Sequence, residues 1–159
     1  MKPSVSLGGR HGLEWAITAF AAWQSADLVS AWRHAPLERG GWMAFGVWIL
    51  PLLLSPQLPV SPRPLWPASA ALALALMGAL GSLNAACYVG LALSVVGQTG
   101  WSKRRALWFA SAIAWMPLLG WLTRDLSDGL RLPLRVLIAG CGVLPMLTPT
   151  LQARFKPTA

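Results

Sequence analysis

A long segment with no charged residue, residues 65–97, constrains the fold more than any other feature. At a rise of roughly 1.5 Å per residue, a single helix over this segment would be longer than a bilayer core of about 30 Å. The segment must therefore fold back on itself. Its only local cluster of turn formers is Gly81-Ser82-Leu83-Asn84, which predicts a tight hairpin of two helices over residues 65–80 and 84–97. Because glycine and alanine dominate both helices, we expect them to be the most closely packed pair.

The rest of the chain is also poor in polar residues. Of its 159 residues, 55% are hydrophobic and only 11% are charged, with a mean hydropathy of +0.54. A soluble domain usually has about 25% charged residues, so this chain has too few to cover a soluble globule. The composition predicts an all-α integral membrane protein, a polytopic bundle of about six transmembrane helices forming a single transmembrane domain over residues 1–159.

Four more apolar runs complete the six expected helices, at residues 13–32, 41–54, 106–123 and 132–151. The first follows a short basic lead, as in a signal peptide, but it is too long and is interrupted by Glu14, Gln24 and Asp27, so we interpret it as a retained helix. Closely spaced prolines over residues 51–67 predict a stiff, extended loop. Pro117 and Gly120 should kink the outer third of the helix at residues 106–123.

Six crossings place most of the positive charge on one side of the membrane. That side receives eight cations and no anion: Lys2, Arg10, Arg63, Lys103, Arg104, Arg105, Arg154 and Lys156. The opposite side receives four cations and three anions. By the positive-inside rule, both termini should be cytoplasmic and the protein should lie in the bacterial inner membrane. Six tryptophans fall at predicted helix ends, as an interfacial belt requires: Trp15, Trp32, Trp42, Trp66, Trp101 and Trp121.

The formal charge of +8 does not indicate a nucleic-acid-binding protein. The cations lie in short clusters between apolar runs, and not along an amphipathic or aromatic-interleaved surface. We interpret them as topology signals and lipid-headgroup contacts. The expected partners are the lipid bilayer and other membrane proteins, with no nucleic acid.

Ionisable groups within predicted spans are the first candidates for a functional site, because they are costly in a membrane. Asp27 and Arg135 are predicted at matching depths near the outer ends of the first and last helices, so they could form an ion pair. The pair would be either structural or the floor of an outward-facing polar pocket. The pocket would be completed by His34, Glu38, Arg124, Asp125 and Asp128. Glu14, one turn inside the cytoplasmic end, is expected to be solvated by lipid headgroups.

Histidines and cysteines give no cofactor site. His11 and His34 are 23 residues apart, roughly 35 Å along a helix, so they cannot jointly hold a haem or a metal ion. Cys87 and Cys141 lie far apart in apolar runs, which predicts neither a disulfide framework nor a metal site. Cys87 is only a weak candidate nucleophile, because its neighbours along the chain offer no base. We expect no cofactor.

Two short stretches combine tryptophan, glycine and basic residues next to an apolar helix. The first is Gly100-Trp101-Ser102-Lys103-Arg104-Arg105-Ala106-Leu107-Trp108-Phe109, which leads to Met116-Pro117-Leu118. The second runs from Ala31-Trp32-Arg33 to Arg39-Gly40-Gly41-Trp42. With the residues between them, they cover about half of the chain and resemble the middle and the first outer loop of exosortase and archaeosortase family membrane proteins.

The resemblance implies a protein related to enzymes that cleave sorting signals with a membrane cysteine, an arginine and a histidine on later helices. Cys87, in Ala86-Cys87-Tyr88-Val89-Gly90, is similar to the outline of the cysteine motif. No histidine follows it, because His34 is the last in the sequence. The chain thus resembles the non-catalytic front part of that fold.

Three functions remain open at this stage. The leading hypothesis is a non-catalytic accessory or scaffold protein whose small-residue helix faces bind partner helices. The second is a reduced exosortase-like cysteine protease or transpeptidase that uses Cys87 and an outer arginine. The third is a small transporter in which Asp27 and Arg135 form the gating pair, although the sequence has no inverted repeats.

Overall fold

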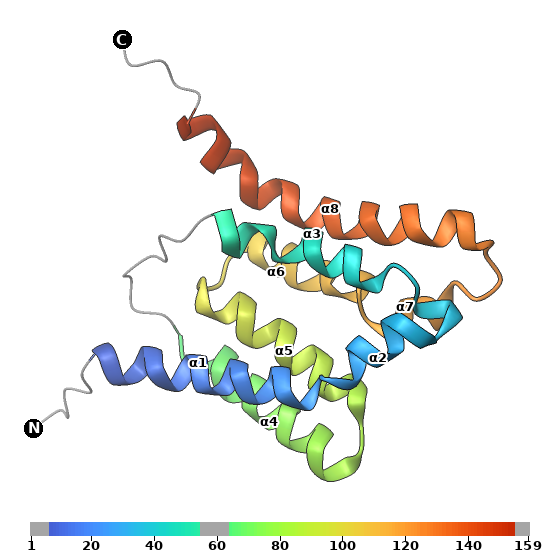
Figure 1. The fold of residues 1–159 in the computed structure, drawn as a ribbon. Coiled ribbons are helices and arrows are strands. Elements are labelled where there is room, and N and C mark those ends of the chain that lie inside the picture. The colour runs from blue at the N-terminus through green and yellow to red at the C-terminus, as the bar shows by residue number, and fades with distance from the viewer. Residues whose placement is uncertain (1–6, 55–63, 155–159) are drawn as a thin grey trace, which may run out of the picture.

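The computed structural model describes the backbone of residues 7–54 and 64–154 and the side chains of residues 11–54 and 64–148, and these described parts are all-helical (Figure 1). In chain order the elements are α1 (Leu7–Gln24), α2 (Asp27–His34), the 3₁₀ helix η1 (Pro36–Glu38), α3 (Gly41–Leu54), α4 (Trp66–Gly81), α5 (Asn84–Gln98), α6 (Lys103–Ala110), the 3₁₀ helix η2 (Ser111–Ala114), α7 (Pro117–Leu122) and α8 (Asp128–Arg154). The all-α class predicted from composition is confirmed. The predicted proline-rich loop falls largely on residues 55–63, outside the described residues.

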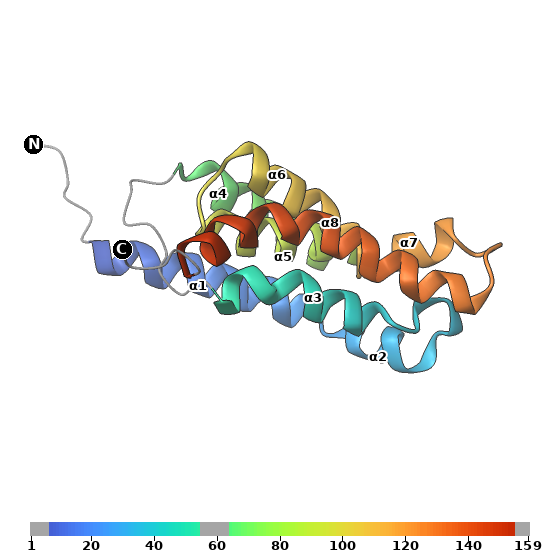
Figure 2. The same ribbon diagram turned by 90° about the horizontal axis from the view of Figure 1, so that it is seen from above.

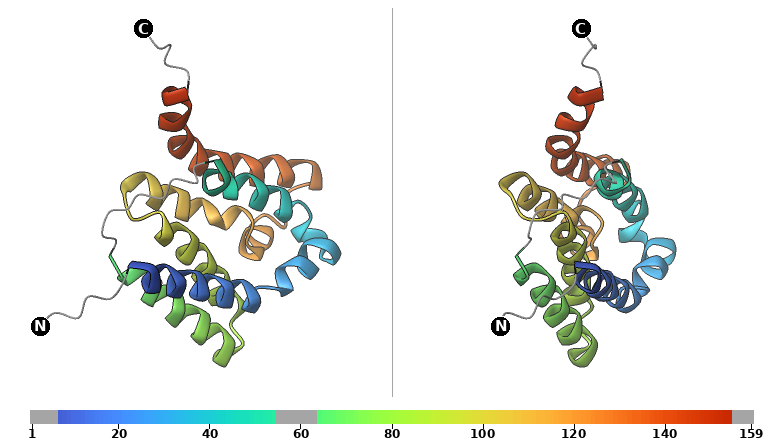
Figure 3. Two further views of the ribbon diagram at one scale, coloured as in Figure 1. Left: turned by 60° about the vertical axis from the view of Figure 1, so that its left-hand side comes forward. Right: turned by 90° about the vertical axis from the view of Figure 1, so that its left-hand side faces the viewer.

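Helix α5 is the centre of the molecule. It packs against α1 and α4 on one side and α6 on the other, while α3 and α8 form a further layer over α6 and η2 (Figures 1 and 2). Ten of its fifteen residues are buried, including every residue from Gly90 to Val96. The C-terminal turns of α8 extend away from the other helices in Figure 1 and in both views of Figure 3.

The predicted hairpin is confirmed, with each helix boundary within about one residue of the prediction. Helix α4 ends at Gly81, and Ser82 adopts the left-handed conformation (φ +52°) that reverses the chain. The Leu83 amide then donates to the Gly78 carbonyl at 3.0 Å, which closes the helix end. Helices α4 and α5 share the most extensive contact of any two elements in the described chain.

The first predicted helix, residues 13–32, is wrong as a single element. The helix breaks at Ser25 and Ala26, and α2 leaves at an angle to α1 (Figure 1). At the break, the Ser25 hydroxyl donates a hydrogen bond to the Ala21 carbonyl at 2.8 Å. The Ser25 amide donates to the carbonyls of both Ala21 and Ala22. A serine that bonds back to the preceding turn bends helices, and nothing in the hydrophobic pattern reports it.

The fifth predicted helix, residues 106–123, is also interrupted. It consists of α6, the tighter turn η2, an extended residue Met116 (φ −77°, ψ 147°) and the short helix α7. Pro117 has no amide hydrogen and forces the residue before it out of the helical conformation. The kink was thus expected at the right proline, but the sequence did not predict that the change begins at Ser111.

The last helix starts earlier than predicted. The sequence placed its start at residue 132, after the charged residues, whereas α8 begins at Asp128. An acidic residue in the first turn is favourable at the positive end of the helix dipole. The Ser127 carbonyl also accepts the first amides, from Leu130 at 3.0 Å and Arg131 at 3.2 Å.

By length and composition, two segments in the described part of the chain could cross a membrane. They are residues Pro36–Leu54, which include η1 and α3, and Asp128–Thr148 in α8. Helices α4 and α5 are apolar but shorter.

Candidate functional site: a buried ion pair at an interrupted helix

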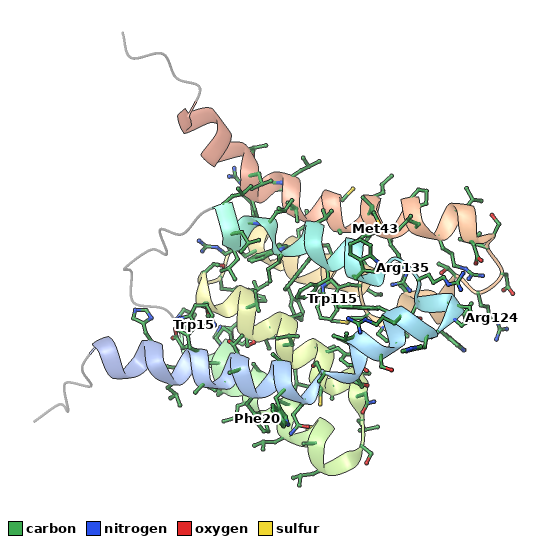
Figure 4. The ribbon with its side chains drawn as sticks, in the orientation of Figure 1. Trp15, Phe20, Met43, Trp115, Arg124 and Arg135 are labelled. Atoms are coloured by element: carbon green, nitrogen blue, oxygen red, sulfur yellow. The ribbon has the colours of Figure 1, made fainter. Side chains whose placement is uncertain are left out.

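Arg135 forms a buried ion pair with Glu38. Arg135 Nη2 donates to Glu38 Oε2 at 2.7 Å, and the two side chains are only 1% and 8% exposed. The same guanidinium donates to the carbonyl of Ala114 at 2.9 Å and to that of Leu37 at 3.2 Å. Figure 4 shows Arg135 inside the bundle, directed from α8 toward the interrupted helix. The pair therefore links η1, η2 and α8.

Gly120 on α7 closes the space beside this pair. A Cβ at this position would collide with Glu38 Oε1, and would lie 2.6 Å from the Leu37 carbonyl and 2.7 Å from Arg135 Nη2. Only glycine allows the α7 backbone to approach the two charged groups so closely. The sequence analysis treated Gly120 only as a helix breaker, and nothing in the sequence relates it to Glu38.

Side chains from other helices bond to the backbone carbonyls at the helix interruption. Arg135 bonds to Ala114, and Trp32 Nε1 donates to the Trp115 carbonyl at 3.1 Å. One turn earlier, Trp48 Nε1 donates to the Trp108 carbonyl at 2.9 Å. Each unmet carbonyl would cost several kcal/mol in a medium without water. The tryptophans and Arg135 therefore stabilise the break.

The tryptophans at this site form one aromatic cluster with Phe45. Trp48 and Trp108 have ring centroids 5.2 Å apart, and each indole donates to the other residue's carbonyl, at 2.9 and 2.8 Å. Trp115 packs edge-on against Phe45 at 5.4 Å and Trp48 at 5.5 Å. Trp48, Trp108 and Trp115 are fully buried, so these three are core residues and not part of an interfacial belt.

The predicted ion pair between Asp27 and Arg135 is wrong. Asp27 Oδ2 instead accepts from Tyr88 Oη at 2.5 Å and from Asn84 Nδ2 at 2.6 Å, both on α5. The break at Ser25 sets the direction of α2, and this places Asp27 beside α5. The sequence analysis matched the depths of Asp27 and Arg135 on straight helices, and the break invalidates that comparison.

The other predicted pocket residues do not converge on Arg135. His34 is exposed, and its Nδ1 lies 3.1 Å from the Ser30 carbonyl of its own helix. Arg124, which Figure 4 shows beyond the end of α7, has its Nε 3.7 Å from Asp125 Oδ1. Its guanidinium carbon lies 5.7 Å from the centroid of the Trp121 ring, near the C-terminal end of α7. Asp128 pairs with Arg131 at 2.8 Å. Of the predicted pocket, only Glu38 reaches Arg135.

Arg131 holds the turn between α7 and α8. Besides Asp128, its guanidinium donates to the carbonyls of Thr123 at 3.1 Å, Arg124 at 2.8 Å and Leu126 at 2.7 Å. Its donors are therefore occupied by the turn itself, and Arg131 has a structural role at this end of the molecule.

Cys87 lies in the interface between α4 and α5. The residue is 2% exposed, and its thiol approaches the Ala75 carbonyl at 3.8 Å. Cys141 is exposed on α8. Among the described residues, no three histidine, cysteine or acidic side chains group closely enough to hold a metal ion.

Most of the buried polar groups at the interrupted helix are bonded to one another, although Arg135 Nε and Trp115 Nε1 have no partner among the described residues. Glu38 and Arg135 neutralise each other's charge, and most of the guanidinium donors face a carbonyl or a carboxylate. Such a network stabilises one arrangement of η1, η2 and α8. The site therefore has the chemistry of a structural ion pair, and it lies inside an all-helical protein. No protein-family model, no curated protein and no solved structure matches this chain.

Proposed function

We propose that this chain is a multi-pass inner-membrane protein that acts as a non-catalytic accessory or scaffold subunit, with both termini in the cytoplasm. Its surface supports membrane insertion. Leucine, tryptophan and methionine side chains are exposed on α1, α3, α4, α7 and α8, whereas the largest fully buried side chains include Arg135. Apolar groups outside and a neutralised ion pair inside suit a lipid solvent better than water.

One observation supports the scaffold function: a stripe of exposed leucines lies along α8. Leu130, Leu137 and Leu144 recur every seven residues and are 61%, 62% and 61% exposed. The opposite face of α8 is buried through Arg135 and Ala139. A seven-residue apolar period is the pattern of a helix that pairs with another helix along a seam. We propose that this stripe docks a partner transmembrane helix.

The small-residue faces first expected to bind partners are used inside the molecule. A Cβ on Gly90 would lie 3.0 Å from the Ala71 carbonyl, and one on Gly97 would lie 2.9 Å from Pro67. Helices α4 and α5 therefore occupy each other's glycine faces. This leaves α8 as the better candidate for a partner surface.

The burial of Cys87 supports the non-catalytic reading over the reduced exosortase-like enzyme. A nucleophilic thiol needs a base within hydrogen-bond reach and access to substrate. The Cys87 thiol instead faces a main-chain carbonyl between two tightly packed helices. The resemblance to the front part of the exosortase fold fits a protein that keeps the scaffold without the reaction.

The interrupted helix α6–α7 is the one feature that favours the transporter alternative, because discontinuous helices often bind ions or substrates through their free carbonyls. Here the carbonyls of Trp108, Ala114 and Trp115 already accept hydrogen bonds from Trp48, Arg135 and Trp32. The break is thus better explained as a structural feature.

Site-specific photo-crosslinking tests the scaffold function. A photoreactive residue replaces Leu137 on the stripe, and a matched probe replaces Leu80 on α4, which is 87% exposed. In native membranes, we expect a discrete protein adduct from position 137 and mainly lipid adducts from position 80. Equal adduct patterns at both positions would contradict a partner surface on α8.

Reporter fusions test the membrane arrangement separately. Fusions at Lys103 and after Ala159 should report the cytoplasm, and fusions near Glu38 and Asp128 should report the opposite side. A cytoplasmic signal at Asp128 would overturn the proposed topology, whatever the crosslinking shows.

A further inference from the structure

A cleft lies between the beginning of α3 and the beginning of α8. Figures 1 and 2 show these two helices starting at the same end of the molecule and running side by side. The cleft has a volume of about 230 Å³. This is several times the roughly 30 Å³ that a water molecule occupies, so the cleft accommodates part of an organic molecule.

The position of the cleft relates it to a membrane surface. Its two walls come from the two segments of the described chain that are long and apolar enough to cross a membrane, Pro36–Leu54 and Asp128–Thr148. The cleft lies where both segments begin. In an inserted protein this is the boundary between hydrocarbon and water, where phospholipid headgroups lie. Trp42, which lines the cleft and is 60% exposed, is of the residue type enriched at that boundary.

The lining of the cleft carries one positive charge that no neighbouring group balances. Of its three charged residues, Arg131 and Asp128 are paired with each other at 2.8 Å. The guanidinium of the third, Arg39, is exposed and forms no hydrogen bond or ion pair with the described residues. The acidic residue next to it, Glu38, is bound to Arg135. The free guanidinium therefore suits an anion, and phosphate matches its fork of N–H donors.

The remaining walls of the cleft are apolar. Trp42 and Met43 project from α3, 60% and 38% exposed, and Leu132 lines the α8 side. Leu132 also packs against the turn before α3, because a Cβ on Gly40 would lie 2.5 Å from Leu132 Cδ1. A ligand that covers this lining must combine an anionic group with an apolar chain.

We propose that the cleft binds one anionic phospholipid, with its phosphate on the Arg39 guanidinium and an acyl chain along the apolar wall. The proposal rests on the membrane insertion proposed above. A basic cleft between two spans is a typical site for an anionic lipid headgroup. A free phosphate ion would satisfy Arg39 but leave the tryptophan, methionine and leucine uncovered. The expected headgroup contact at Glu14 is wrong, since that residue is buried and only 9% exposed.

Lipid binding by the full-length protein in a neutral detergent tests the site. Native mass spectrometry gives the dissociation constant of the first bound lipid, for phosphatidylglycerol and for phosphatidylcholine with the same acyl chains. We expect wild-type protein to bind phosphatidylglycerol about tenfold more tightly. Arg39→Gln should remove this preference, because it loses a charge-assisted hydrogen bond. Arg33→Gln, at an exposed position on α2 outside the cleft, is the matched control and should keep it.

Two further measurements identify the chemistry of the ligand. Arg39→Lys keeps the charge without the fork of donors, so it should retain a weaker preference for phosphatidylglycerol. Glycerol 3-phosphate, a soluble analogue of the headgroup, should not displace the bound lipid at millimolar concentration. Displacement by this analogue would show that the cleft binds a free phosphate and would overturn the lipid site.

Two other results would also contradict the proposal. One is equal affinity of the wild-type protein for the two lipids, which would leave the cleft to an acidic segment of a partner protein. The other is an equal loss of affinity in Arg39→Gln and Arg33→Gln, which would show general attraction to a basic surface. Lipid binding in detergent depends on neither the partner helix nor the direction of insertion. Such a failure is thus distinguishable from a failure of the crosslinking or of the reporter fusions.

Discussion

Two helix interfaces in this molecule are built on opposite principles. Between α4 and α5, glycines remove side chains, and the backbones approach until a Cβ on Gly90 would meet the backbone of Ala71 and Ala75. Between α3, the interrupted helix and α8, bulky indoles fill the space and donate hydrogen bonds to the backbone. The α4 and α5 backbones lie close together because the glycines place no side chain between them. The second interface is filled by the side chains of three tryptophans and an ion pair.

The difference teaches what each interface needs from the chain. The hairpin has regular helices, whose backbone groups bond within each helix, so van der Waals contact is sufficient. The other interface contains a broken helix, whose carbonyls must find donors. Tryptophan and arginine supply both volume and donors. The two interfaces should therefore respond differently to substitution.

The largest expected effect is the loss of Arg135. Arg135→Met leaves the Glu38 carboxylate buried without a counter-charge, and it removes the donors to the Ala114 and Leu37 carbonyls. Removing one partner of a buried pair costs about 3–5 kcal/mol. Denaturant unfolding in detergent should show such a loss, whereas Arg124→Met, at an exposed site, should change stability little.

The double variant Glu38→Gln, Arg135→Met tests which carboxylate is paired with Arg135. Because it leaves no uncompensated charge, it should be more stable than Arg135→Met alone. Asp27→Asn should instead add its cost to that of Arg135→Met, since Asp27 bonds to Tyr88 and Asn84. Coupling between Asp27 and Arg135, with none between Glu38 and Arg135, would contradict the observed pairing.

Overpacking the hairpin should have the next largest effect. Gly90→Leu drives a side chain into the α4 backbone, and the expected cost is about 1–3 kcal/mol. Gly46→Leu, on α3 of the other interface, is the matched control because a Cβ there meets nothing within 4 Å. Thermal unfolding in detergent measures both. If the two variants lose stability equally, Gly90 does not determine the close approach of the α4 and α5 backbones.

The hairpin could be predicted from the sequence because its causes are local. The missing charges over residues 65–97, the turn at Gly81 to Asn84 and the small residues all lie within one segment. Structure and prediction agree there to within about one residue at each helix boundary. The bounds of α3, residues 41–54, were predicted for the same reason, since Gly40-Gly41 precede an uninterrupted apolar run.

The second interface could not be predicted, because its causes are distant in sequence. Arg135 and Glu38 are 97 residues apart, and the two indoles that exchange hydrogen bonds are 60 apart. The sequence identified Arg135 as a candidate through the cost of charge in a membrane, and Glu38 as a residue completing the same polar pocket, but it joined Arg135 to Asp27. That error came from the break at Ser25, where a single side-chain hydrogen bond redirects α2.

The smallest effect should separate hydrogen bonding from volume within the aromatic cluster. Trp48→Phe and Trp115→Phe remove the same atoms from two fully buried residues. Trp48 Nε1 donates to the Trp108 carbonyl, whereas Trp115 Nε1 has no partner among the described residues. Both variants lose packing, but only the first loses a hydrogen bond, so Trp48→Phe should be the more destabilising by about 1 kcal/mol. Chemical unfolding in one detergent, with both variants measured side by side, gives the difference. Equal losses of stability would mean that the indoles stabilise this interface by filling space alone and not by hydrogen bonding. The glycines of the hairpin stabilise their interface in the opposite way, by leaving space for the backbones to approach.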